Sequence, residues 1–172
     1  MKNVFPVAIL SFFAFLFLGF SILKTVDFPD EMALYASHNR FKEPMLKERR
    51  FKHADIVPLL NALPAAYRLK VVGKSMEGRN IYSATMGNGP VSVLLWSQMH
   101  GDEPTATMAL FDIFRFMQRH DEFDGFRDKM LSKLTIHVVP MLNPDGAERY
   151  TRRNVQDIDI NRDAQRLQTP EG

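Results

Sequence analysis

The sequence contains no cysteine, so disulfides, thiolate metal sites and thiol nucleophiles are all excluded. It also lacks a marked charge excess, because it contains 22 basic and 20 acidic residues and has a formal net charge of +2. This balance gives no reason to expect a nucleic-acid partner. Internal repeats and low-complexity segments are absent as well. The 172 residues fit one globular domain, with 45% hydrophobic residues, so function must be sought in local motifs.

One long apolar run stands at the N-terminus. Residues 4–23 carry no charge and follow Lys2. About 20 residues suffice to span a bilayer, and the run exceeds the usual signal-peptide core of about 7–15 residues. We therefore expect residues 1–26 to be a signal peptide or an N-terminal membrane anchor; the anchor is favoured because the small-residue cleavage site at 19–21 is poor. The protein is then exported, periplasmic or extracellular, and held at the membrane through residues 4–23 if uncleaved.

The remainder, residues 27–172, has the pattern of an α/β domain. Strand, helix and strand in succession predict a sheet with a parallel pair. The run 91–96 is continuously apolar, which predicts a strand buried on both faces. "NPDG" at 143–146 predicts a turn. The other expected elements are two helices within 27–66, a hairpin of 67–72 with 81–85, a helix from Pro104 to about Arg119, a short helix near 124–131 and a strand in "LTIHVVPML".

The motif "HGDE" lies where the apolar strand meets the helix that begins at Pro104. An imidazole from His100 and a carboxylate from Glu103 are good zinc ligands, and ligands bind at strand ends in open α/β sheets. Gly101 between them permits a tight backbone turn. Glu103 also has a purely structural explanation, as a helix N-cap.

The second motif is the segment "NPDGAERYTRRNVQDIDINRD", residues 143–163. It combines a turn with a dense set of Arg and Asn side chains. Arginine binds carboxylates through two parallel hydrogen bonds and can stabilise an oxyanion. On composition alone, however, a charged surface loop explains the segment equally well.

Taken together, the ordered motifs resemble those of the M14 zinc carboxypeptidases. "HGDE" is followed by "PMLNPDG" and then by an arginine nine residues before an Asn-Arg pair, while the upstream "GKSMEGRNI" is similar to the hairpin that precedes the zinc motif in that family. The resemblance covers roughly residues 55–172. It implies a mixed, largely parallel sheet flanked by helices, which we expect to be truncated after the first strands.

The same resemblance implies a role for each matching residue. His100 and Glu103 match the first two ligands of a Zn²⁺ cofactor, and Arg152 matches the catalytic arginine that binds the substrate carbonyl and steadies the oxyanion. Asn161 and Arg162 match the pair that binds the terminal carboxylate of a peptide substrate. The implied activity is zinc-dependent hydrolysis that releases C-terminal residues from peptides.

Some residues fit these roles less well. Arg149 and Arg153 have the wrong spacing to the Asn-Arg pair, and His137 lies mid-strand, where a sheet histidine is expected rather than a ligand. Asp157 stands where many relatives have Gly. The family also needs a third ligand, a His, and a Glu as general base; we expect both beyond residue 172.

We therefore interpret residues 27–172 as the N-terminal part of a zinc carboxypeptidase-like domain. Two alternatives stay open. One is a zinc deacylase of the aspartoacylase or succinylglutamate desuccinylase type, which shares the His-x-x-Glu site and the Asn-Arg pair. The other is a non-catalytic, membrane-anchored remnant that binds carboxylates. The sequence carries no signal for an oligomeric state.

Overall fold

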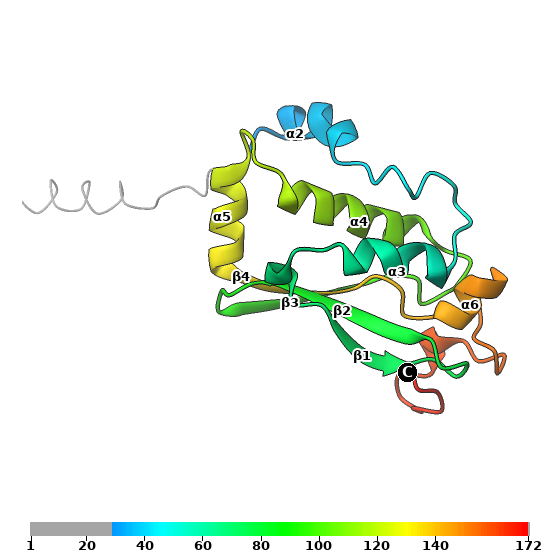
Figure 1. The fold of residues 1–172 in the computed structure, drawn as a ribbon. Coiled ribbons are helices and arrows are strands. Elements are labelled where there is room, and N and C mark those ends of the chain that lie inside the picture. The colour runs from blue at the N-terminus through cyan, green and yellow to red at the C-terminus, as the bar shows by residue number, and fades with distance from the viewer. Residues whose placement is uncertain (1–28, 172) are drawn as a thin grey trace, which may run out of the picture.

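The computed structural model describes residues 29–171 (Figure 1). The predicted signal peptide or anchor, residues 1–26, lies outside the described residues. From Pro29 to Glu171, the structure contains no helix that is both long and apolar enough to cross a membrane.

Four strands of the described chain form one sheet in the order β1-β2-β4-β3. β2 pairs antiparallel with β1 and with β4, whereas β3 and β4 run parallel. A parallel pair requires a crossover connection, and the chain between β3 and β4 makes it through two helices. The predicted mixed α/β fold is therefore confirmed, as is the predicted hairpin. The described part of the sheet is not largely parallel as expected, because the hairpin strand β2 pairs antiparallel with both of its neighbours. The strands are β1 (Lys70–Lys74), β2 (Asn80–Gly87), β3 (Val91–Trp96) and β4 (Leu134–Val139).

The helices gather on one side of this sheet. Figure 1 shows α3 and α4 along the sheet, α2 outside them, α5 at one end and α6 at the other. Each helix predicted from the sequence is present, although α2 is shorter than the predicted segment and is followed by a single 3₁₀ turn, residues 38–40. The bounds are α2 (Glu31–Ser37), α3 (His53–Asn61), α4 (Thr105–Gln118), α5 (Asp124–Lys133) and α6 (Pro144–Arg149).

Helix α4 fills the core because its apolar residues recur with helical spacing. Pro104 stands just before its first turn, where a missing N–H costs nothing. Its buried face meets the inward-pointing residues Ala84 of β2 and Val138 of β4, which are fully buried. The buried residues of α4 are Thr107, Leu110, Phe111, Phe114 and Met117.

Strand β3 departs from the prediction. We expected both of its faces to be buried, but Leu94 and Trp96 are 56% and 53% exposed. Only the alternate residue Leu95 packs on the core, because side chains in a strand point to opposite faces. The prediction was wrong because a continuous apolar run does not show which segment covers each face, and the described helices cover only one.

The "NPDG" segment also differs from its prediction, since it begins helix α6 rather than forming an isolated turn. The Asn143 side chain caps the helix by accepting a hydrogen bond from the N–H of Gly146, at 2.8 Å. Pro144 occupies the first helical position, and the acidic Asp145 lies in the first turn, where the helix dipole favours it. Turn-forming residues and helix-starting residues overlap, so the four letters alone could not distinguish the two outcomes.

Asp145 joins helix α6 to the loop between β1 and β2. Its carboxylate is fully buried and accepts hydrogen bonds from Ser75 Oγ at 2.7 Å, from the N–H of Glu77 at 3.0 Å and from Arg79 Nη1 at 2.6 Å. Burial alone would raise the pKa of Asp145, but these hydrogen bonds and the Arg79 charge hold it below its usual value. The hairpin loop and "NPDG" are therefore one structural unit.

We predict that Asp145→Asn destabilises the fold by about 2 kcal/mol near neutral pH, since it removes the charge from a buried group that accepts hydrogen bonds from Ser75, from the Glu77 N–H and from Arg79. The lowered pKa means that the stabilisation is fully present above about pH 3.9 and is lost as the pH falls through the lower folded pKa. Urea unfolding should therefore show a large difference between wild type and variant near neutrality and a smaller one at about pH 3.

Glu148→Gln is a matched control, because its only ion pair, with the exposed Lys52, lies at the surface. It should change stability by less than about 1 kcal/mol. Equal losses in the two variants would contradict the assigned role of Asp145.

Candidate functional site

The loop from β3 to α4 is held rigidly although it is irregular. Sheet-like pairing continues past the strand ends, with hydrogen bonds from the N–H of Leu142 to the Ser97 carbonyl and from the N–H of Asn143 to the Gln98 carbonyl, both 3.0 Å. Gln98 has a positive φ of 48°. Its buried side chain fixes this conformation by donating to the Gly101 carbonyl at 2.9 Å and accepting from Thr107 Oγ1 at 2.8 Å.

Gly101 is required by packing rather than by a tight turn. A Cβ built on Gly101 would lie 1.9 Å from the carbonyl carbon of Gly146 and 2.3 Å from the nitrogen of Ala147. The backbones of the "HGDE" loop and helix α6 are thus in direct contact, and no other residue fits at position 101. The predicted tight turn is present, closed by a hydrogen bond from the N–H of Glu103 to the His100 carbonyl at 3.1 Å, but its φ at Gly101 is one that other residues also adopt.

Asn143 ties this contact to the rest of the site. Besides capping α6, its fully buried amide donates to the Met99 carbonyl at 3.3 Å and to the Arg152 carbonyl at 3.5 Å. One side chain therefore links the histidine loop, helix α6 and the arginine segment. The sequence suggested only a turn for Asn143, because asparagine is common both in turns and at the N-cap of a helix.

His100 and Glu103 lie together directly after β3. His100 Nδ1 is 3.0 Å from Glu103 Oε2. The imidazole is buried, at 8% exposure, whereas the Glu103 side chain is 61% exposed. Glu103 does not cap helix α4, since Pro104 occupies the cap position and no side-chain cap bond forms there.

Asp159 holds the other side of the His100 ring. Its Oδ1 lies 3.1 Å from His100 Nε2, so an N–H on Nε2 would leave the Nδ1 lone pair directed at Glu103. Burial alone would raise the pKa of Asp159, but hydrogen bonds from His100 and the Asn161 backbone, with the nearby Arg152 charge, hold it below its usual value. The sequence analysis missed Asp159, because "DIDI" offers two acids and nothing in the letters distinguishes them.

Arg152 bridges the two carboxylates. Its Nε donates to Asp159 Oδ2 at 3.3 Å, and its Nη1 donates to Glu103 Oε1 at 3.2 Å. The other two arginines of this segment point elsewhere: Arg149 pairs with Glu77, and Arg153 pairs with Asp157. Of the three arginines, only Arg152 reaches the His100–Glu103 pair.

The Asn161–Arg162 pair lies beside this cluster in a 3₁₀ turn, residues 160–162. The N–H of Asn161 donates to the Asp159 oxygen that also faces His100, at 3.0 Å. The Arg162 side chain is exposed and donates to the Asn161 carbonyl at 3.2 Å. Asp157 adopts a φ of 60°, a left-handed conformation that glycine adopts without strain. The Asn161 backbone is therefore joined to His100 through the Asp159 carboxylate, and Arg162 follows it in the same turn.

The pair His100–Glu103 fits a zinc ion. Two ligands at about 2.0–2.1 Å on a tetrahedral ion lie about 3.3 Å apart, close to the 3.0 Å between Nδ1 and Oε2. Two lone-pair donors at that distance need a proton or a cation between them. Asp159 supplies the carboxylate partner that metal-binding histidines usually have on the opposite ring nitrogen.

The described residues supply two donors and not three. No group of three or more His, Cys, Asp or Glu side chains between residues 29 and 171 is arranged to hold a metal ion. Asp159 cannot be the third donor in this arrangement, since it faces Nε2 rather than Nδ1. His137, as expected, lies within β4, where its Nδ1 is 2.9 Å from Thr85 Oγ1.

Known proteins share these features. The model of the zinc carboxypeptidase family matches residues 54–168. Carboxypeptidase SOL1 of Arabidopsis thaliana is 26% identical over 102 residues, which cover 56% of this chain and 21% of that protein. An uncharacterized protein of Zymomonas mobilis, ZMO1242, is 30% identical over 114 residues, which cover 65% of this chain and 29% of that protein.

The fold has counterparts among solved structures. A metallo-carboxypeptidase from Burkholderia cenocepacia superposes with a TM-score of 0.56 at 24% identity, covering 64% of this chain and 31% of that one. The chain thus spans less than a third of the length of each of these three relatives.

We predict that Asp159→Asn weakens zinc binding by about 10–100-fold, because an amide binds the imidazole N–H less strongly and orients the ring less well. Competition with a chromophoric chelator measures the affinity. Asp157→Asn is the matched control: its side chain is 86% exposed and pairs only with Arg153, so it should leave the affinity unchanged. An equal loss in both variants would show that loop charge, rather than contact with His100, sets the affinity.

Proposed function

Because the chain belongs to the zinc carboxypeptidase family, we propose that it acts as a zinc-dependent metallocarboxypeptidase that releases C-terminal residues from peptides. The observation that carries this proposal is the convergence of the His100–Glu103 pair and Arg152 on a single carboxylate, Asp159. A charged surface loop without function is not expected to place a buried histidine between two carboxylates, Glu103 and Asp159.

The residues have distinct roles in the proposed reaction. His100 Nδ1 and Glu103 would hold Zn²⁺, which when bound polarises the scissile carbonyl and lowers the pKa of a water. The guanidinium of Arg152 contacts Glu103, so it lies where it can donate hydrogen bonds to the carbonyl oxygen as negative charge develops there. Asp159 holds the His100 ring and the Arg152 side chain in one fixed relation.

Asn161 and Arg162 give the proposed exopeptidase specificity. A guanidinium and an amide, both exposed and in the turn whose backbone contacts Asp159, suit the planar carboxylate at the end of a peptide. Binding that carboxylate here would set the last peptide bond against the Arg152 side chain. The proposed substrates are therefore peptides with a free C-terminus.

The third zinc ligand and the general base belong to the same proposal. Catalytic zinc commonly takes three protein ligands, and the described residues provide two at this point. We propose that a further His and a Glu outside residues 29–171 complete the site.

The proposed location is outside the cytoplasm. The uncharged run 4–23 supports export, and its length supports retention as a membrane anchor. The substrates would then be peptides in the periplasm or the extracellular space.

We predict that the 24–172 segment with added zinc does not release C-terminal residues from peptides, because it lacks the base that contributes typically about 10²–10⁴-fold. A longer polypeptide that includes a third His ligand and a Glu should release them from free-carboxylate peptides and not from amidated ones. Amino-acid release measures both. Turnover of N-acyl amino acids alone would support a deacylase instead, and comparable peptide turnover by the short segment would contradict the two-donor interpretation.

In the active polypeptide, we predict that Arg152→Met lowers kcat by about 10²–10³-fold, the effect expected for loss of an oxyanion donor. Arg153→Met removes a neighbouring guanidinium that pairs only within its own loop and should leave kcat near wild type. Unfolding curves for both variants would separate catalysis from stability. A loss shared equally by the two variants would remove the basis for assigning Arg152.

A further inference from the structure

We propose that helix α2 docks on the surface of a lipid bilayer, with Met32 and Tyr35 inserted into the interfacial layer. This proposal rests on the membrane anchor proposed above. It concerns a surface of the described chain that has no part in the zinc site.

Helix α2 exposes apolar side chains where a water-facing helix would carry charges. Met32 is 71% exposed and Tyr35 is 76% exposed. They are three residues apart, so they share one face of the helix. Ala33 and Ala36 are also exposed, and Glu31 is the only charged residue in the helix. Within the described chain, the Tyr35 ring stacks on His38, with 6.2 Å between centroids, yet both Met32 and Tyr35 remain largely open to solvent.

The neighbouring surface continues this apolar character. A hollow of about 230 Å³ lies beside α2 and is lined mainly by apolar side chains of α2, α4 and α5, including Leu34, Ile113 and Phe116. Ile113 on α4 is itself 38% exposed. A bilayer interface can contact such an uneven apolar surface, because lipid chains adapt to its shape.

The length of the chain that precedes α2 identifies the bilayer as the partner. Eight residues, 24–31, lie between Leu23, the last residue of the uncharged run, and Met32. Even fully extended, the nine steps from Leu23 to Met32 span at most about 30 Å. An anchor through residues 4–23 would therefore keep α2 close to the membrane at all times, which makes even a weak surface contact effective.

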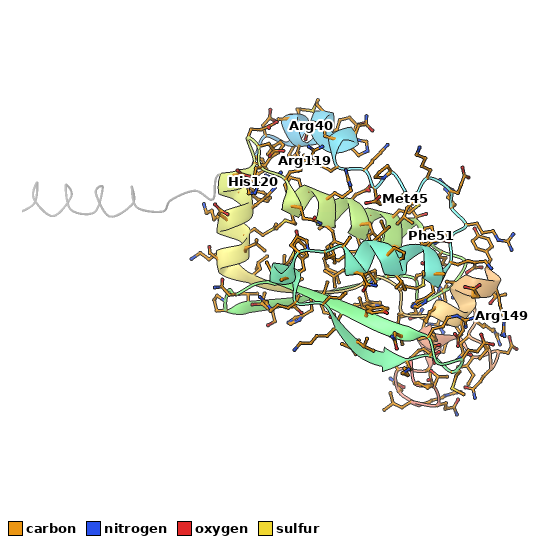
Figure 2. The ribbon with its side chains drawn as sticks, in the orientation of Figure 1. Arg40, Met45, Phe51, Arg119, His120 and Arg149 are labelled. Atoms are coloured by element: carbon orange, nitrogen blue, oxygen red, sulfur yellow. The ribbon has the colours of Figure 1, made fainter. Side chains whose placement is uncertain are left out.

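Helix α2 itself carries no cation: it begins at Glu31, and Asp30 caps it. Nearby, Arg40 Nη2 lies 2.5 Å from Glu122, and Arg119 donates to the Arg40 carbonyl at 3.1 Å. Figure 2 shows Arg40 and Arg119 at the same end of the molecule. Because the charges on α2 are acidic, insertion of Met32 and Tyr35 rather than binding of anionic headgroups drives the contact. Tyrosine is enriched at membrane interfaces because its ring is apolar while its hydroxyl can stay in contact with water.

Docking in this orientation would leave the zinc site accessible. Figure 1 shows α2 at one end of the described chain and α6, which packs against the "HGDE" loop, at the other. The His100–Glu103 pair would then face away from the bilayer and toward peptides in solution.

The test uses the absence of native cysteine, which allows a single fluorophore to be attached at a chosen position. Met32→Cys and, as a matched control, Met45→Cys carry the label; Met45 is an equally exposed methionine, at 73%, on a different segment. The full chain is reconstituted in phosphatidylcholine vesicles that contain lipids brominated near the headgroup end of the chains. We expect quenching at position 32, which should lie about 5–10 Å into the interface, and little at position 45.

A second substitution, Tyr35→Ser in the Met32→Cys chain, should weaken the quenching because it removes half of the inserted surface. Sedimentation with the vesicles reports the anchor separately. A chain that sediments but shows equal quenching at both positions keeps the anchor and overturns the docking. A chain that does not sediment overturns both. Shielding of position 32 that follows protein concentration rather than lipid would indicate a second copy and also overturns the proposal.

Discussion

The site depends on the direct backbone contact between Gly101 and Gly146. A Cβ at Gly101 would overlap the backbone of Gly146 and Ala147, so the "HGDE" loop and helix α6 can meet only because position 101 is glycine. A Cβ at Gly146 would overlap the Asn143 side chain that caps α6, so glycine there makes room for the cap. The contact fixes the distance between the strand that supplies His100 and the segment that supplies Arg152. Asn143 then secures both partners through the carbonyls of Met99 and Arg152.

Hydrogen bonds and charges around Asp159 then orient the side chains of the site. Asp159 accepts hydrogen bonds from His100, Arg152 and the Asn161 backbone, so one carboxylate sets the positions of the histidine and of a cationic group. The guanidinium of Arg152 is shared between Asp159 and the exposed Glu103, and it therefore stays beside the His100–Glu103 pair.

Two carboxylates, the fully buried Asp145 and the partly buried Asp159, thus organise different parts of the structure. Asp145 holds the β1–β2 loop against helix α6, and α6 in turn supports the Gly101 contact. Asp159 acts directly on the site. Helix α2, with its exposed apolar residues, lies far from helix α6. The proposed membrane docking and the proposed peptide hydrolysis therefore use separate surfaces.

The sequence by itself determined the local elements, because hydrophobic period, proline position and glycine spacing act over a few residues. It also indicated the donor types at His100 and Glu103, since few side chains bind zinc. The family resemblance and the spacing to Asn161 also favoured Arg152 over Arg149 and Arg153. Tertiary structure alone decided that Asp159 and not Asp157 holds the histidine, and that one face of β3 stays open. Each of these depends on contacts between segments distant in the chain, and neighbouring residues of the same type differ only in which way the folded backbone directs them.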